Sequence, residues 1–205
     1  MSACKCTCRP WPASLRTIRS CHPDSPCVDI VSVAVACGQH VVLCHPTELL
    51  VSGAAGAGSA EDKAACTAIW QDAERWRMGS NNPNVTLDDT WFPRGFGTDE
   101  AVIADRMWFV CAPDGEPAAT TTSWYDRDTR GTRGVVHYVG MKKAYAGRGL
   151  SKPLFTRVLL RLRELGHTDC HLGTSTGRVE AINLYVKYGF MPNPRSATEY
   201  RAWRE

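Results

Sequence analysis

The stretch V-V-H-Y-V-G-M-K-K-A-Y-A-G-R-G-L-S-K-P-L-F-T-R-V-L-L-R-L-R-E-L-G, residues 135–166, predicts a strand, a glycine turn and a helix. Alternation along the strand places one set of side chains on a single face: Val135, His137, Val139 and Met141. Gly147 and Gly149 permit a tight turn, and apolar residues then recur at helical spacing: Leu150, Leu154, Val158, Leu162 and Leu165. Gly166 is expected to end this helix as its C-cap. A glycine turn that enters a helix leaves backbone amides available for an anion such as phosphate, although a plain strand-to-helix turn has the same pattern.

A second strand and helix follow directly. Residues 168–174 predict a strand, and residues 178–190 predict a helix that ends at Gly189. The chain contains no G-x-x-x-x-G-K-[ST] motif, which excludes a P-loop. It also has no G-x-G-x-x-G followed by an acidic residue about 20 positions on, which argues against a dinucleotide-binding fold.

Together these two units resemble the GNAT superfamily of acetyl-CoA-dependent N-acyltransferases over roughly residues 100–192. The family's first motif is a strand followed by [RQ]-x-x-G-x-[GA] and a helix, and A-G-R-G-L-S at 146–151 falls in register. The second motif ends in A-x-x-L-Y-x-x-x-G-F, which is matched by Ala181, Leu184, Tyr185, Gly189 and Phe190. The resemblance implies an α/β (α+β) fold with a central mixed, mostly antiparallel sheet flanked by helices. It implies an N-acetyltransferase that moves an acetyl group from acetyl-CoA to a primary amine by direct attack in a ternary complex.

The resemblance also implies how acetyl-CoA is held. The amides from Gly147 to Lys152 are expected to bind the diphosphate, and the strand edge at Val139 and Met141 is expected to pair with the pantetheine amides. The implied cofactor-binding set is Val139, Met141, Ala146, Gly147, Arg148, Gly149, Leu150, Ser151 and Lys152. Ala146 departs from the usual Arg or Gln, so one polar contact is missing. Arg148 and Lys152 can offset that loss as phosphate partners, or they are ordinary surface charges.

Two residues are candidates for the chemistry. Tyr185 occupies the family position whose hydroxyl commonly faces the sulfur of coenzyme A, or it is a packing tyrosine. His137 lies where the serotonin-acetylating branch carries a histidine, and a neutral imidazole can take a proton near pH 7. Three carboxylates remain alternative bases, namely Glu116, Asp126 and Glu180, and water alone serves some family members. Alternation predicts that Tyr138 faces the opposite side, and that Cys170 and His171 do not form a nucleophile–base pair.

Composition sets the wider limits. The chain has 205 residues, a net charge of +3 and 10 cysteines, of which seven lie in the first 44 residues. The sequence lacks a recognisable export signal and an apolar membrane segment, so we expect a soluble, cytoplasmic protein with reduced thiols. The charge gives no case for nucleic acid. We expect acetyl-CoA and an amine as the binding partners and either a monomer or a homodimer.

The predicted domains are a Cys-rich extension, residues 1–45, and an acetyltransferase domain, residues 46–205. The extension possesses two strand-like segments, 28–35 and 41–44. Its cysteines begin as C-x-C-x-C, which is not the paired C-x-x-C of common structural zinc sites, so no metal is expected. The alternatives left open are a catalytically degenerate module that binds acyl-CoA or a partner protein, and an interaction protein that uses a metal-binding arm.

The remaining segments complete the prediction. Residues 52–58 read as a small-residue linker, and Ser59 is expected to cap a helix that carries Ala65, Ile69, Ala73 and Trp76 on one face. Strands at 107–112 and 118–125 are expected to form a hairpin through Asp114-Gly115. Three aromatic residues, Trp91, Phe92 and Phe96, either line an acceptor pocket or pack in the core. Residues 191–205 add at most a last strand.

Overall fold

A computed structural model describes residues 27–34, 50–53, 59–76, 86–112, 114–126 and 131–203. The strands are β1 (Cys27–Ala34), β2 (Leu50–Gly53), β3 (Met107–Cys111), β4 (Pro117–Tyr125), β5 (Gly134–Met141), β6 (Asp169–Ser175) and β7 (Met191–Pro192). They form one sheet in the order β2-β3-β4-β5-β6-β1-β7, in which neighbours are antiparallel except β5 and β6. The prediction of a mixed, mostly antiparallel sheet is therefore confirmed.

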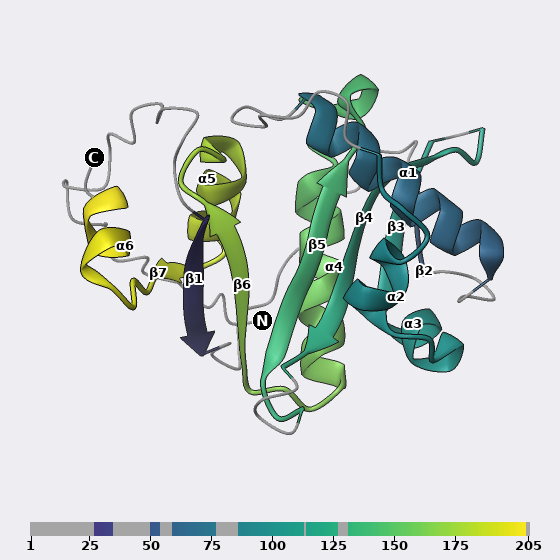
Figure 1. Ribbon diagram of the computed structural model, residues 1–205. Coiled ribbons are helices and arrows are strands. Elements are labelled where there is room, and N and C mark those ends of the chain that lie inside the picture. Colours follow the sequence, from purple (N-terminus) through teal and green to yellow (C-terminus); the bar gives the residue numbers. More distant parts are fainter. Residues whose placement is uncertain are drawn as a thin grey trace, which may run out of the picture.

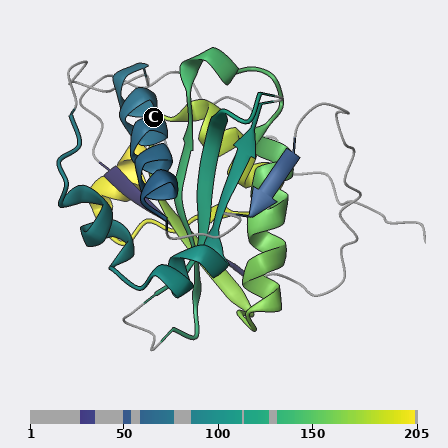
Figure 2. The ribbon, with the colours of Figure 1, turned by 90° about the vertical axis from the view of Figure 1, so that its right-hand side faces the viewer.

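Helices cover both faces of this sheet. They are α1 (Ala60–Trp76), α2 (Trp91–Phe96), α3 (Glu100–Arg106), α4 (Ser151–Glu164), α5 (Val179–Lys187) and α6 (Ala197–Ala202). Figures 1 and 2 show α1 and α2 on one face of the sheet and α4 on the other. The helices of the described residues include none that is long and apolar enough to cross a membrane.

Helix α1 begins as the sequence predicts. The Ser59 hydroxyl accepts a hydrogen bond of 3.2 Å from the Asp62 amide, which satisfies one of the amides left unpaired at a helix start. Its buried residues are Cys66, Ile69, Trp70 and Ala73, which recur at helical spacing. Of the residues predicted to share one face, Ile69 and Ala73 are buried, whereas Trp76 at the end of the helix is 38% exposed.

The hairpin of β3 and β4 is confirmed, with Gly115 at φ +88 and its amide bonded to the carbonyl of Ala112. The linker prediction is wrong for Ser52 and Gly53, because they pair with Phe109 and Trp108 as part of β2. Backbone pairing at the sheet edge outweighs the small-residue composition there.

Two expectations concern the ends of the chain. The segment predicted at 28–35 forms β1, which lies between β6 and β7, whereas 41–44 lies outside the described residues. At the other end, the expected last strand is only β7, and helix α6 follows it unpredicted. The Ser196 hydroxyl caps α6 by accepting from the Glu199 amide.

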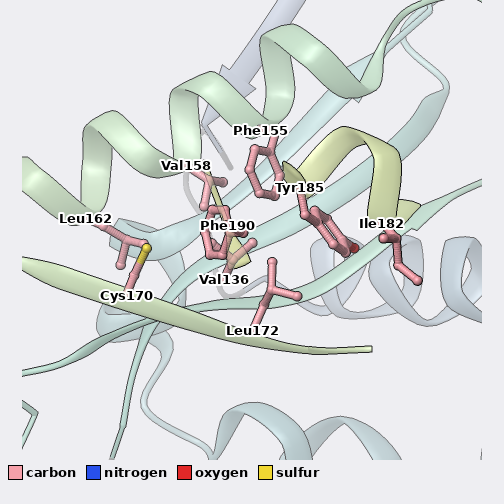
Figure 3. Close-up of a cluster of buried hydrophobic side chains, with 9 residues drawn as sticks. All are labelled: Val136, Phe155, Val158, Leu162, Cys170, Leu172, Ile182, Tyr185 and Phe190. Carbon is pink, nitrogen blue, oxygen red and sulfur yellow. The ribbon is translucent and has the colours of Figure 1, made fainter. Parts of the chain in front are cut away.

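Helix α4 covers the second face with the predicted apolar residues, of which Leu154, Val158 and Leu162 are buried. Gly166 ends it with φ +84, as a C-cap glycine does. The core between α4, α5, β5 and β6 is shown in Figure 3 and consists of Val136, Phe155, Val158, Leu162, Cys170, Leu172, Ile182, Tyr185 and Phe190. Burial in this core raises the pKa of the Cys170 thiol to about 12, which fits the interpretation of Cys170 as a small packing residue.

Candidate active site

Strands β5 and β6 part soon after they meet. Their parallel pairing consists of Gly134 with Cys170 and Val135 with His171. Beyond this point β6 continues to pair with β1 on its other edge, and Figure 1 shows β5 and β6 diverging toward the end of β5. From Val136 to Met141, the edge of β5 that faces β6 thus has no ladder partner among the described residues. An extended ligand with amide groups can pair with such an edge.

A β-bulge lies in this same part of β5. The register with β4 shifts between Thr120 and Thr122, so that Tyr138 and Val139 together oppose one residue of β4. Tyr138 has φ +50, a left-handed conformation that is uncommon for a bulky side chain. The extra residue breaks the alternation of side chains along the strand.

The bulge corrects the predicted faces of β5. Val135 and Tyr138 pack in the cluster beneath α1 and α2, and His137 contacts Phe96 in the same cluster. Val139 packs on the opposite face, with α4 and α5, and Met141 packs there with Leu150 and Leu154 of the α4 segment. The prediction that Val135, His137, Val139 and Met141 share one face is wrong, and so is the prediction that Tyr138 lies opposite His137, because the inserted residue reverses the alternation.

His137 is fixed by helix α2. Its Nε2 lies 3.0 Å from the carbonyl oxygen of Gly95. Because a carbonyl only accepts, Nε2 carries the hydrogen in this contact, and Nδ1 is the basic nitrogen of the neutral ring. The ring also lies parallel to Trp124 at a centroid distance of 6.1 Å and meets Phe96 edge-on at 5.3 Å. An imidazole held in one orientation and tautomer suits proton transfer.

The three carboxylates that are alternatives to His137 as the base lie in surroundings that differ from those of His137. Glu116 accepts hydrogen bonds of 2.9 Å from Lys142 Nζ and Tyr145 Oη. The bond from Lys142 is the largest cause that lowers the pKa of the Glu116 carboxyl. Asp126 lies 4.0 Å from His171 Nε2, and Glu180 is exposed at the start of α5. Glu116, which the sequence offered as a candidate base, therefore contacts residues just before the glycine turn.

The glycine turn between β5 and α4 has the expected geometry. Gly147 and Gly149 both have φ +77, and an added Cβ at either position would meet no atom of the described residues within 4 Å. Leu150 is 1% exposed and anchors the turn to the core. No hydrogen bond within the described part of the chain uses the amides of residues 147–151 as donors. The turn thus combines unpaired amides, open space and a helix start, which fits a bound diphosphate.

Contacts from two sides hold this turn. The Lys142 amide donates to the Ala118 carbonyl, and the Lys143 amide donates to Asp72 of α1 at 2.6 Å. The guanidinium of Arg148 lies over the ring of Tyr145 at 5.1 Å, beside the turn amides. This contact orients one positive charge at the turn.

Tyr185 lies in the core between α4 and α5. It is 5% exposed, and its ring is 5.4 Å from Phe155 and 6.3 Å from Phe190. In Figure 3 its hydroxyl points toward the side of Ile182, away from Leu162 and Cys170. The ring thus has a packing role, and the hydroxyl end projects away from the part of the core where β5 and β6 pair.

The three aromatic residues of the α2 segment have mainly a core role. Phe92 and Phe96 are 6% and 1% exposed in the cluster beneath α1. A separate cavity of about 440 Å³ lies between α1 and residues 87–93, and Phe92 is one of its lining residues. None of the predicted catalytic or cofactor-binding residues lines it.

Sequence reasoning missed Trp70 and Gly95, which contact the bulge and His137 from α1 and α2. Nothing local in the sequence marks either residue, because their roles arise from packing against a strand far along the chain. The Cys-rich segment 1–26 lies outside the described residues. Within the described ranges, no three His, Cys, Asp or Glu side chains cluster closely enough to hold a metal ion.

Comparison with known proteins adds independent findings. A family model described as the Acetyltransferase (GNAT) family matches residues 60–190. The chain is 34% identical over 135 residues to mycothiol acetyltransferase of Nocardia farcinica, an alignment that covers 59% of this chain and 42% of that protein. The chain therefore spans less than half the length of this curated relative.

Solved structures share the fold. A GCN5-related N-acetyltransferase from Sphaerobacter thermophilus superposes with a TM-score of 0.62 at 14% identity, covering 83% of this chain and 50% of that one. The ribosomal-protein-S18-alanine N-acetyltransferase from Escherichia coli superposes with a TM-score of 0.52 at 17% identity, covering 70% of this chain and 77% of that one. Identities this low support the similarity of fold alone.

Proposed function

The chain belongs to the acetyltransferase (GNAT) family, and from this premise we propose that it transfers an acetyl group from acetyl-CoA to a primary amine. One observation carries the proposal. A turn with unpaired amides at residues 147–151 directly follows the strand edge that β6 leaves without a partner. This arrangement suits a ligand with a diphosphate at one end and amides in its extended arm.

We propose that the backbone from Gly147 to Ser151 binds the diphosphate of acetyl-CoA, since the Lys152 amide donates to the Gly149 carbonyl. Arg148 stands in for the polar side chain that Ala146 lacks, because its guanidinium already lies beside the turn on the Tyr145 ring. The edge of β5 at Val139 and Met141 then pairs with the pantetheine amides. Acetyl-CoA supplies the acetyl group as a thioester.

The chemical roles go to His137 and Tyr185. The amine nitrogen forms a bond to the acetyl carbon, the carbon–sulfur bond breaks, and coenzyme A leaves as a thiolate. His137 Nδ1 takes the proton released by the amine, since Nε2 is bonded to the Gly95 carbonyl. The Tyr185 hydroxyl donates to the departing thiolate and lowers the cost of its charge.

The acceptor belongs to the class of primary amines. The name of the relative, mycothiol acetyltransferase, favours a small-molecule acceptor here. An assay panel therefore includes the acceptor of that enzyme, simple amines, amino acids, aminoglycosides and N-terminal peptides. Thiol release with each acceptor identifies the class.

The test compares two glycines at opposite ends of α4. Gly149→Val and Gly166→Val each place a branched side chain at a positive φ, +77 and +84, where none of the atoms that the structure describes lies within 4 Å of the new Cβ. Their backbone strain is thus matched, but only Gly149 lies in the turn with the unpaired amides. Titration calorimetry should show that Gly149→Val loses acetyl-CoA affinity while Gly166→Val retains it.

Equal affinity in the two folded variants would contradict the proposed binding site. Acetyl-CoA binding without acetylation of any amine in the panel would indicate a degenerate binding module instead.

A further inference from the structure

Two backbone carbonyls at the bulge in β5 accept hydrogen bonds from side chains. The carbonyl of His137 accepts a hydrogen bond of 3.2 Å from the hydroxyl of Thr121 on β4. The carbonyl of Tyr138 accepts one of 3.2 Å from the indole Nε1 of Trp70 on α1. Side chains of β4 and α1 therefore bond to the backbone at the point where the register of the ladder shifts.

The conformation that Trp70 contacts is a strained one. A bulge of this kind normally has glycine at the left-handed position, and here a tyrosine occupies it with φ +50. Such a conformation persists only where its surroundings over-determine it. The indole bond to the Tyr138 carbonyl is one such restraint.

The packing around Tyr138 supplies further restraints on its left-handed conformation. Its ring lies 4.7 Å from Trp70, 5.1 Å from Trp91 and 5.0 Å from Phe96, measured between centroids. Gly95 lies so close that a Cβ there would come within 2.9 Å of the tyrosine ring.

Gly140 allows the indole its close approach. A Cβ at Gly140 would lie 3.1 Å from Trp70 Nε1 and 3.3 Å from its Cδ1, which is tighter than ordinary contact. Trp70 itself is 8% exposed, so its position is set by the core beneath α1. The absence of a side chain at Gly140 of β5 and the buried position of Trp70 in α1 thus allow the indole N–H to reach the Tyr138 carbonyl.

We propose that Trp70 is a positioning residue for the reaction. Its indole holds the Tyr138 carbonyl and thereby fixes the bulge, so that His137 stays on the α1–α2 face while Val139 and Met141 are turned to the face covered by α4. The inference rests on the proposed function, because these are the groups assigned to the amine and to acetyl-CoA. Without the bulge, alternation would return Val139 and His137 to one face.

The test uses the whole chain and two matched variants. Trp70→Phe keeps an apolar ring but removes the N–H, whereas Trp91→Phe removes an indole from the same aromatic cluster without touching the Tyr138 carbonyl. Amide hydrogen exchange should become about tenfold faster at residues 137–140 in Trp70→Phe only, because a carbonyl loses its partner. The acetyl-CoA dissociation constant should rise by about the same factor in that variant alone.

Unchanged exchange at residues 137–140 in Trp70→Phe would overturn the inference. Equal changes in Trp91→Phe would also overturn it, since they would reflect general loss of packing. If Trp70→Phe does not fold, Gly140→Ala replaces it and is judged by the same two measurements, because its Cβ displaces the indole while both rings remain. A protein that binds acetyl-CoA but acetylates no amine would contradict the proposed function, and the exchange and binding comparison would still decide the role of Trp70.

Discussion

Replacing Tyr185 with phenylalanine isolates the hydroxyl that we assign to the departing thiolate. The ring is 5% exposed and packs against Phe155 and Phe190, and phenylalanine preserves both contacts. The substitution therefore separates the chemical role of Tyr185 from its packing role. Tyr185→Ala would confound the two, because removal of a buried aromatic ring costs about 3–5 kcal/mol of stability.

The expected effect on turnover is large. Loss of one positioned donor to a developing negative charge lowers turnover by about 100- to 1000-fold, or about 3–4 kcal/mol. The expected effect on the free energy of unfolding is only about 1 kcal/mol, the usual net value of one hydrogen bond. Tyr185→Phe should thus lose most of its turnover while its free energy of unfolding changes little.

The assay is thiol release from acetyl-CoA with the best acceptor of the panel, under conditions where chemistry limits the rate. Tyr188→Phe is the control, because its hydroxyl contacts Thr156 Oγ1 at 2.8 Å and the Lys152 carbonyl at 2.9 Å. It should raise the KM for acetyl-CoA and leave kcat nearly unchanged, since it supports the turn and not the thiolate. Full turnover by Tyr185→Phe in this assay would refute the assignment and make solvent the proton donor.

Three further outcomes test the turn, the core and the N-terminal segment. Glu116→Gln should weaken acetyl-CoA binding a few-fold, because the carboxylate holds Lys142 and Tyr145 beside the turn through exposed contacts. The unsubstituted protein should show the same loss of affinity as pH falls through the lowered pKa of Glu116. In titrations, an acyl donor without the diphosphate should show neither effect. Burial raises the pKa of Cys170 from 9.0 to about 12, so the stability that its thiol contributes is complete below pH 9 and is lost as pH rises toward 12. In urea unfolding, the free energy of unfolding of Cys170→Ala should therefore fall less steeply with alkaline pH than that of the unsubstituted protein. The same pH dependence in both proteins would contradict this. Deletion of residues 1–26 should leave acetyl-CoA affinity intact by calorimetry, whereas unfolding with loss of bound zinc would reveal a structural metal site there.

The sequence predicted the elements whose signals are local. The strand, glycine turn and helix at 135–166 follow from alternation, glycine placement and leucine spacing, and the hairpin at Gly115 follows from its Asp-Gly pair. Each of these signals lies within a few residues of the structure that it specifies. The candidate site at the glycine turn and at the strand edge of Val139 and Met141 was implied by the two family motifs.

The faces of β5 could not be predicted in the same way. Alternation fails at Tyr138 because a bulge inserts one residue, and the restraints on that bulge come from Trp70 and Gly95, far away in the sequence. The strand at Ser52 and Gly53 was missed for a related reason, since only pairing with β3 makes that small-residue segment extended.

The short junction between β5 and β6 has a consequence for how the protein resists unfolding. In the described part of the chain, two residue pairs join the strands β2 to β5 to the strands β6, β1 and β7 across the sheet. Side chains of the α4 core and the ion pair of Arg133 with Asp169 add further contacts. If acetyl-CoA pairs with the open edge as we propose, it adds a strand-like link at this junction and binds only the folded chain. By mass action it adds about 2.7 kcal/mol of stability at a hundred times its dissociation constant. The supply of acetyl-CoA would thereby set the lifetime of the protein against heat and proteases as well as its rate of turnover.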